Sequence, residues 1–177
     1  MKQMRINKEN FRQAQYDVFQ KFTDQYAVVT AGDIGDFNCM TLGWGMMGNV
    51  WGHPGPALTI YVQPSRYTFE YMQKNDYFTV SFLPKEHHED ARVLGRISGR
   101  DGDKIAHTQL HPVPLKHGVG FKEAELTFVC KKICAQQFDL ACVPDFMKEG
   151  MYKTFAPHYF YIGAVEDAFG EMKGWNE

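Results

Sequence analysis

The sequence predicts a mainly β protein with added helices, an α+β chain folded as a closed or split β-barrel. Several strand-length segments are rich in valine, threonine and aromatic residues, and only two or three helical segments lie between them. Strands and helices do not alternate regularly, which argues against the βαβ units of a parallel sheet. The length of 177 residues is that of one domain. We therefore expect a single domain over residues 1–177, with its core at about residues 24–167.

The first half of the chain opens on a predicted helix, because residues 7–22 carry apolar side chains at a helical spacing. The next expected elements are a strand at 26–31, a turn at 33–38, a strand at 40–50, a break at 53–56, a strand at 57–62, a helix at 66–74 and a strand at 77–83. Glycines in the 40–50 strand indicate bulges or a close approach of another backbone. Ser65 is the predicted N-cap of the 66–74 helix.

The second half continues with two helices and returns to strands. The expected elements are a helix at 86–97, a short helix at 101–109, a strand at 124–135, a loop around 143–152, a strand at 158–165 and a loose terminus at 170–177. Several strands with two or three intervening helices are the pattern of a barrel with added helices.

The composition excludes several classes of function. The formal net charge is −2, so the chain lacks the basic footprint of a nucleic-acid-binding protein. The longest apolar runs are of strand length and too short to span a bilayer, and the N-terminus lacks the apolar centre of a signal peptide. We expect a cytoplasmic protein without nucleic-acid or membrane partners. Its cysteines are then free thiols, and Cys130 and Cys134 lack the second matched pair of a zinc site, so no metal is expected.

Pro64-Ser65-Arg66-Tyr67-Thr68 offers a phosphate site at the predicted start of a helix. Unpaired backbone N–H groups and the helix dipole both favour an anion at a helix N-terminus. The Arg66 guanidinium has a planar fork that matches phosphate oxygens, and Ser65 and Thr68 add hydroxyl groups. The alternative is an ordinary capped helix whose arginine lies in solvent.

The segment from Asn38 to Trp44 suits a flat ring with a polar edge. In a strand, Asn38, Met40, Leu42 and Trp44 share one side, and the neighbouring glycines let the backbone approach a ring closely. The alternative is that Met40, Leu42 and Trp44 are core residues.

Gly43-Trp44-Gly45-Met46-Met47-Gly48 also matches the glycine spacing of a dinucleotide-binding fingerprint. We reject that interpretation, because the motif needs a helix that opens at its glycines and an acidic residue further on. The sequence that follows, Asn49-Val50-Trp51-Gly52-His53-Pro54, cannot open a long helix.

Ser98-Gly99-Arg100-Asp101-Gly102-Asp103-Lys104 predicts a tight loop before a short helix. Lys104 at the start of that helix can reach a phosphate, and Asp101 or Asp103 can cap the helix. The alternative is a solvated turn between two helices.

Together these motifs resemble the flavin reductase-like, FMN-binding split-barrel family, flavoredoxin-type proteins in particular. The run at 64–68 is similar to the family's R-P-S-R-Y-T, with Gln63 where many relatives have arginine, and the run at 98–104 is similar to S-G-R-D-x-D-K. The resemblance implies FMN as the cofactor. The implied cofactor-binding residues are Asn38, Met40, Thr41 and Trp44 at the ring, Ser65, Arg66, Thr68 and Lys104 at the phosphate, and Ser98 and Arg100 beside it. No residue of the chain is assigned a catalytic role, since the flavin carries the redox chemistry.

The resemblance further implies an FMN-dependent oxidoreductase, either a flavin reductase or a flavoredoxin-like electron-transfer protein. The electron donor would be NAD(P)H or a redox protein, and the protein would work as a homodimer with the flavin near the subunit interface. Two alternatives stay open: a non-catalytic flavin-binding module, and a related split barrel that binds haem, in which the histidines would matter. His87 and His88 lie on a predicted helix where a solvated face is the ordinary interpretation.

Overall fold

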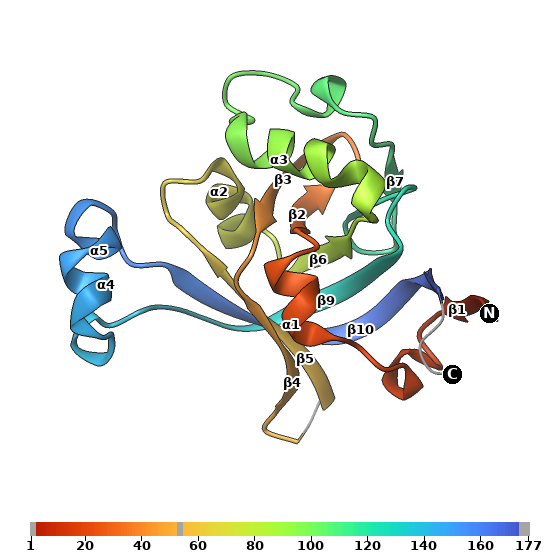
Figure 1. Cartoon of the computed structure of the whole chain (residues 1–177), viewed down its shortest axis with the longest axis horizontal. Helices are drawn as coiled ribbons and strands as arrows, with labels where there is room; N and C mark the ends of the chain where they lie inside the picture. The colour runs from red at the N-terminus through yellow and green to blue at the C-terminus, as the bar shows by residue number, and fades with distance from the viewer. Residues whose placement is uncertain (1–2, 53–54, 174–177) are drawn as a thin grey trace.

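The computed structural model describes residues 3–52 and 55–173, and its centre is an eight-stranded antiparallel sheet (Figure 1). The strands are β1 (Gln3–Ile6), β2 (Ala27–Asp33), β3 (Asp36–Leu42), β4 (Gly45–Val50), β5 (Gly55–Val62), β6 (Tyr77–Phe82), β9 (Leu126–Gln137) and β10 (Tyr159–Lys173). The order across the sheet is β3-β2-β6-β9-β10-β5-β4, and β1 pairs with β10. A separate two-stranded sheet joins β7 (Pro112–Pro114) to β8 (Val119–Phe121).

The helices lie outside this sheet. They are α1 (Val18–Thr23), α2 (Tyr67–Lys74), α3 (His88–Arg96), α4 (Asp145–Glu149) and α5 (Met151–Thr154). Short 3-10 turns stand at Phe11–Gln13, Lys85–His87, Ile105–His107 and Leu140–Cys142. None of the helices in the described part of the chain is long and apolar enough to cross a membrane. The predicted class, mainly β with added helices, is confirmed.

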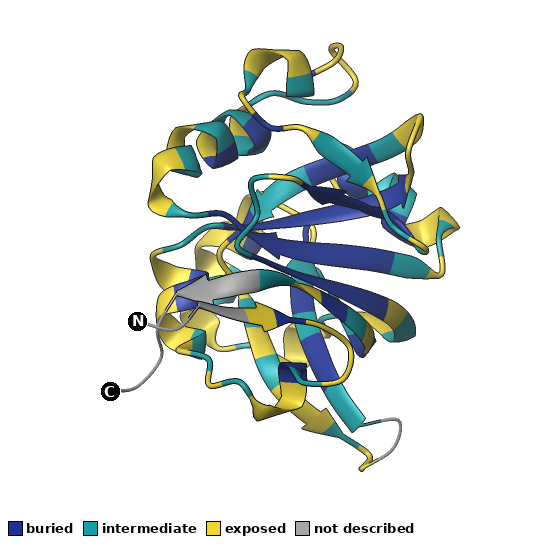
Figure 2. Cartoon of the chain, turned by 90° about the vertical axis from the view of Figure 1, so that its right-hand side faces the viewer, coloured by how far each residue is buried: buried dark blue, intermediate teal, exposed yellow. Residues whose placement is uncertain are grey.

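The sheet curls around one main apolar core, and Figure 2 shows the buried residues concentrated in its central strands. Phe78, Val80 and Phe82 of β6 contribute to this core together with Phe128 of β9 and Tyr161 of β10. A second, smaller apolar cluster fills the space between β2, β3 and α3. Burial of this apolar surface is the main force that holds the sheet curled around its core.

The strands β9 and β10 are the longest in the structure and extend beyond the barrel. The first half of β9 pairs with both β6 and β10, whereas its second half pairs only with β10. Residues 138–158, here called the arm, join the far ends of these two strands and carry α4 and α5 (Figure 1). The predicted loop around 143–152 is therefore wrong, since that segment forms two short helices.

The predicted helix at 7–22 is also wrong, because two short helical pieces replace it. The chain becomes extended at Ala14, and Asp17 starts α1 by accepting a hydrogen bond from the Gln20 backbone N–H at 3.0 Å. Asp favours caps because its side chain competes for backbone donors. The apolar pattern itself was informative, since Phe11 and Phe22 are both buried in the main core. Two separate short segments bury these apolar side chains against the barrel, so one continuous helix is not required.

The predicted strand at 40–50 divides into two, because the chain leaves β3 at Leu42 and enters β4 at Gly45. The strand β3 pairs with β2, whereas β4 pairs with β5 on the other edge of the sheet. Gly45 passes directly over the Phe22 ring, where a Cβ atom would lie 2.2 Å from Phe22 Cε1. The glycine thus marks a close approach, as expected, but to a side chain instead of a backbone. The predicted turn at 33–38 is likewise shorter, since β3 begins at Asp36.

The remaining strand predictions at 26–31, 57–62, 77–83 and 124–135 are confirmed, as are the helices at 66–74 and 86–97. The predicted helix at 101–109 reduces to the turn Ile105–His107, whose N-cap is Lys104 and not an aspartate, while Asp103 Oδ1 accepts from the Ile105 N–H at 2.9 Å. The last strand continues to Lys173, so the loose terminus at 170–177 is wrong up to that residue. The rest of that prediction lies outside the described residues.

Ser65 does not cap α2. The N-cap is Arg66, and the Ser65 hydroxyl donates to Gln63 Oε1 at 2.7 Å. The first turn of α2 thus opens without a side-chain cap, and the Tyr67 and Thr68 backbone N–H groups have no hydrogen-bond partner among the described residues, whereas the Phe69 N–H donates to Arg66 O at 2.9 Å.

Candidate functional site

Two adjoining cavities collect the residues that the sequence singled out. The basic cavity, of about 230 Å³, lies between the start of α2, the end of α3 and the loop 98–104. The aromatic cavity, of about 470 Å³, lies between the β3–β4 connection, the start of α2 and the arm. The predicted residues on the basic cavity are Asn38, Met40, Ser65, Arg66, Thr68, Ser98, Arg100 and Lys104. Thr41 and Trp44 line the aromatic cavity, which shares Met40, Ser65 and Arg66 with the basic one.

Arg66 stands on the wall common to both cavities. It is the N-cap of α2 and is exposed, and its guanidinium forms no ion pair within the described part of the chain. Its positive charge also acts on Lys104 and His158, and it lowers the pKa of each. A cation that repels its neighbours, at a helix N-terminus with open N–H groups, is the arrangement that an anion would stabilise.

Lys104 is buried, with only 5% of its surface exposed, and its ammonium is surrounded by backbone carbonyls. Nζ donates to Cys39 O of β3, to Leu94 O at 3.3 Å and to Ile97 O at 3.5 Å. The last two carbonyls belong to the C-terminal end of α3, where a cation is favourable. Burial, with the nearby Arg66 charge, lowers the pKa of Lys104. Lys104 thus links β3 to the C-terminal end of α3 beneath the basic cavity and contributes a positive charge there.

Asn38 and Thr68 form a second tie under the basic cavity. The buried Asn38 amide donates to Thr68 Oγ1 at 2.7 Å, which links β3 to the first turn of α2. Gly99 of the loop covers this amide so closely that a Cβ atom there would lie 2.2 Å from Asn38 Oδ1. The structure therefore places Asn38 at the basic cavity and not on the aromatic cavity, where the predicted ring would bind.

Arg100 and Ser98 hold the loop 98–104 against α2. Arg100 pairs with Glu70 at 2.5 Å, donates to Ser65 O at 3.3 Å and lies 4.8 Å from the centre of the Tyr67 ring. Ser98 Oγ accepts from the Arg100 backbone N–H at 3.2 Å. Arg100 and Glu70 are both exposed, so this ion pair adds little stability by itself. Its effect is to fix the rim of the basic cavity.

The aromatic cavity has flat side chains on its walls and a strand edge along one side. The Trp44 and His158 rings lie 4.7 Å apart at 36°, and Tyr61 meets Trp44 edge-on at 6.4 Å. Because β3 is an edge strand, half of its backbone N–H and C=O groups face away from β2. The Thr41 side chain is directed elsewhere, since its hydroxyl donates to Ala91 O of α3. At Thr41 only the backbone can serve a ligand.

Sequence reasoning missed the contribution of the arm. Met151, Phe155 and His158 come from it and line the aromatic cavity together with Tyr61 and Gln63. Met151 and Phe155 are four residues apart, a helical spacing that could have revealed α5. Their position over the cavity had no signal in the sequence, since it depends on how β9 and β10 carry the arm.

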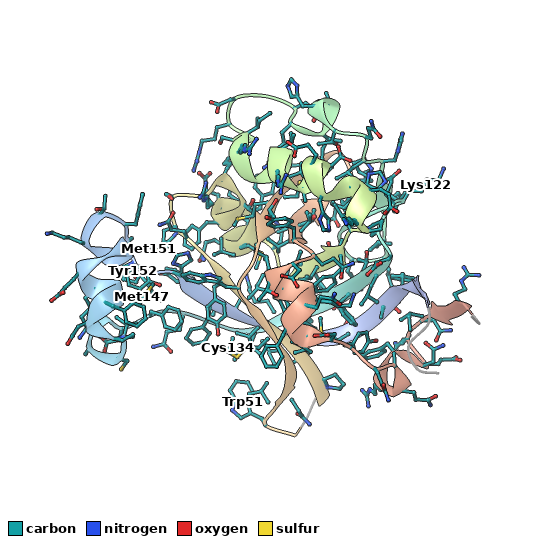
Figure 3. The ribbon with its side chains drawn as sticks, in the orientation of Figure 1. Trp51, Lys122, Cys134, Met147, Met151 and Tyr152 are labelled. Carbon is teal, nitrogen blue, oxygen red and sulfur yellow. The ribbon has the colours of Figure 1, made fainter. Side chains whose placement is uncertain are left out.

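A third, apolar cavity of about 890 Å³ lies on the other side of Trp44, between α1, β4 and the arm. Phe19 and Phe22 of α1 line it, as do Met147 and Tyr152 of the arm. Figure 3 shows Met147 and Tyr152 on the side of the arm that faces the barrel. The surface of this cavity is mainly apolar.

The family model for the flavin reductase like domain matches residues 19–171 of this chain. A flavoredoxin from Methanosarcina acetivorans is 24% identical, over 89% of this chain and 73% of that chain, with a TM-score of 0.64. An FMN-binding protein from Thermus thermophilus, with bound 1-cyclohex-2-enone, is 18% identical over 89% and 78% of the two chains, with a TM-score of 0.65.

A putative flavin reductase with a split barrel domain from Shewanella frigidimarina is 18% identical over 82% of this chain and 66% of that chain, with a TM-score of 0.65. No curated protein sequence matched. At these identities the solved structures show a shared fold, and the fold is the split barrel that the sequence predicted.

Proposed function

The chain belongs to the flavin reductase-like domain family, and from this premise we propose that it binds FMN across the basic and aromatic cavities and works as an oxidoreductase. The observation that carries the proposal is Arg66, which stands on the wall shared by both cavities and whose guanidinium forms no ion pair with the described residues. The phosphate would bind at Arg66 and the open first turn of α2, with Thr68 and Lys104 beneath it. The residues present therefore fit a dianionic phosphate.

The flavin ring would occupy the aromatic cavity. Trp44, Tyr61 and Phe155 supply flat or apolar contacts, and the outward backbone groups of β3 supply donors and acceptors for a polar ring edge. The arm covers this cavity and would limit the access of water. Bound FMN supplies hydride and electron transfer, and the protein's part is to bind and orient it.

The electron donor in this proposal is NAD(P)H or a redox protein. Gly43, Gly45 and Gly48 lie at the β3–β4 connection and in an edge hairpin, without the strand–helix turn of a dinucleotide fingerprint. A nicotinamide would then have to stack directly on the flavin, near Trp44, whose side of the cavity is open: 42% of its surface is exposed. Anaerobic stopped-flow mixing with NADH or NADPH tests this. Bleaching of the flavin supports a reductase, and its absence leaves the redox-protein donor.

The direct test of the cofactor is a titration of the purified protein with FMN and with riboflavin. We expect tight binding of FMN and much weaker binding of riboflavin, because riboflavin lacks the phosphate that Arg66 would hold. Equal affinities would contradict the phosphate site. A haem-type absorption spectrum of the protein as purified would contradict the flavin and favour the haem-binding alternative.

We also propose that the protein is a homodimer that uses the apolar side of the arm. The surface near the apolar cavity carries several exposed apolar side chains, among them Phe19, which is 86% exposed, and Phe146, which is 73% exposed. Trp51, at the tip of the β4–β5 hairpin below this surface in Figure 3, is 70% exposed. Exposed apolar patches are typical of protein interfaces. Sedimentation at micromolar concentration tests the proposal, and a species at the 20.4 kDa of one chain would contradict it.

A further inference from the structure

Among the described residues that line the aromatic cavity, His158 is the titratable side chain that comes from the arm. Tyr61 and Arg66 come from the barrel side. It stands directly before β10 and is half-buried. The Trp44 ring lies 4.7 Å from its ring, and Tyr152 of α5 holds Nδ1 at 3.1 Å from its hydroxyl oxygen. The tilted contact with the Trp44 ring and this hydrogen bond fix both the position and the rotation of the imidazole.

The hydrogen bond also determines which ring nitrogen carries the proton. Tyr152 is buried, and in the described part of the chain its hydroxyl has His158 Nδ1 as its hydrogen-bond partner. His158 Nδ1 is the acceptor that the described residues offer to this part-buried hydroxyl, so Tyr152 is assigned as the donor and Nδ1 as the acceptor. In a neutral imidazole the other nitrogen then bears the proton. His158 Nε2–H has no hydrogen-bond partner among the described residues and lines the cavity as a free donor.

The surroundings keep this imidazole neutral near pH 7. Burial, and to a smaller extent the Arg66 charge, lower the pKa of His158. Three neighbours face it: Arg66 from the start of α2, Tyr152 from α5 and Trp44 from the β3–β4 connection. None of the three is an acid that would favour the imidazolium.

We propose that His158 donates its Nε2–H to the polar edge of the flavin ring, and that Tyr152 is the positioning residue that fixes this tautomer. The proposal rests on the proposed function, since it concerns FMN in the aromatic cavity. Two-electron reduction adds negative charge to the polar edge of a flavin, so a fixed donor there stabilises the reduced cofactor more than the oxidised one. His158 would therefore set the reduction potential, in addition to contributing to affinity.

The test compares the affinity for oxidised FMN with that for reduced FMN, through the midpoint potential of the bound cofactor in a dye-linked redox titration. We expect His158→Phe, which keeps a flat ring without a donor, to weaken reduced FMN about tenfold relative to oxidised FMN. For a two-electron couple this is a fall of about 30 mV. His158→Gln retains an N–H donor, so its midpoint potential should lie closer to that of the unmutated protein. Tyr152→Phe should cause a smaller fall of the same sign.

A control variant separates this role from a general effect of replacing a histidine. His107→Phe, at an exposed histidine outside both cavities, should change neither the affinity for FMN nor the midpoint potential. An unchanged potential in His158→Phe that still binds FMN would overturn the inference and leave the proposed function intact. If the unmutated protein binds no FMN, both the inference and the proposed function are refuted.

A second measurement needs no cofactor. Long-range ¹H–¹⁵N NMR spectra of the ligand-free protein report which ring nitrogen of each histidine is protonated, and the His158→Gln variant identifies the His158 signals. We expect the Nε2–H form at pH 7.5 for His158. A spectrum of the Nδ1–H form, or of the imidazolium, would contradict the inference whatever the flavin titrations show.

Discussion

The basic cavity and the apolar cavity flank the aromatic cavity, and their walls are held in different ways. Around the basic cavity, Asn38, Thr68, Arg100 and Lys104 are each engaged in hydrogen bonds within the chain. Arg66 alone of the predicted phosphate-site cations is left without a partner in the described residues. The apolar cavity has methionine and phenylalanine side chains from α1, β4 and the arm, which lack directional bonds.

We propose that this difference matches two kinds of ligand. A cavity whose polar side chains are already engaged, apart from one arginine, would be preorganised for a small anion of fixed shape. Flexible apolar side chains can instead adapt to a second surface, as methionine does at many interfaces. The predictions below alter one side of the comparison at a time.

The largest expected effect follows from Lys104→Met. The substitution leaves the carbonyls of Cys39, Leu94 and Ile97 without their shared donor, and we expect the free energy of unfolding to fall by about 3 kcal/mol. FMN affinity should fall as well. Urea unfolding monitored by circular dichroism measures the first effect, and flavin fluorescence measures the second.

Lys132→Met is the matched control for that variant. Lys132 donates in the same way to the carbonyls of Met72 and Asn75 at the C-terminal end of α2, away from both cavities. It should lose comparable stability and keep its FMN affinity once folded. Equal loss of FMN affinity in both variants would show that Lys104 acts through stability alone.

Arg66→Ala is expected to leave the fold intact and to weaken FMN. One charge-assisted hydrogen bond contributes roughly 1.5–3 kcal/mol, which corresponds to about one to two decades in affinity. Riboflavin binding should hardly change. Isothermal titration calorimetry with both ligands measures the difference, and Arg100→Ala, whose guanidinium is already paired with Glu70, should show a smaller loss. A larger loss in Arg100→Ala would move the phosphate site to the loop 98–104.

Phe146→Asp tests the other side of the comparison. Phe146 is highly exposed on α4, so a charge there should cost the monomer little stability but should weaken an interface about tenfold or more. Sedimentation velocity over a concentration series measures the dissociation constant of the dimer. Ile34→Asp, at an exposed apolar residue in the β2–β3 turn and outside the three cavities, is the control. The interface would lie elsewhere if Ile34→Asp weakened the dimer more than Phe146→Asp.

The smallest effect is a pH dependence that arises from His158. Its pKa is lowered in the folded protein, so the unfolded chain binds more protons as the pH falls below the ordinary histidine value of about 6.5. The contribution of His158 to stability is thus fully present above that value and is lost as the pH falls from it toward the lowered pKa. The Tm of the ligand-free protein, measured between pH 7.5 and 5, should fall less steeply with pH in His158→Gln than in the unmutated protein. Parallel plots of Tm against pH would mean that other groups cause the acid sensitivity.

The parts of the site that come from one short segment were predictable from the sequence. Ser65, Arg66 and Thr68 stay together at a helix start in any fold that keeps α2, and Gly99 and Gly102 make the loop 98–104 tight wherever it packs. The residues expected at the cofactor do all line the two cavities, although their role in binding it stays a prediction.

The hydrogen-bond partners of these site residues were not predictable from the sequence. The hydroxyl of Thr41 bonds to α3, and the ammonium of Lys104 bonds to carbonyls of β3 and α3. Each choice depends on which elements pack beside the residue. The same holds for the helix expected at 7–22, where burial of Phe11 and Phe22 against the barrel outweighed the local helical pattern.

The sequence by itself determined most strands of the barrel, the helix that follows Arg66 and the motifs at 64–68 and 98–104, because alternation, turn residues and helix starts act over a few neighbouring residues. Tertiary structure alone decided that the arm covers the aromatic cavity, that Asn38 lies under the loop 98–104 and that His158 meets Trp44. These contacts join residues far apart in the chain, for example Trp44 and His158, or Lys104 and Cys39. They form where burial and hydrogen-bond satisfaction of the whole barrel are most favourable, and no local pattern encodes them.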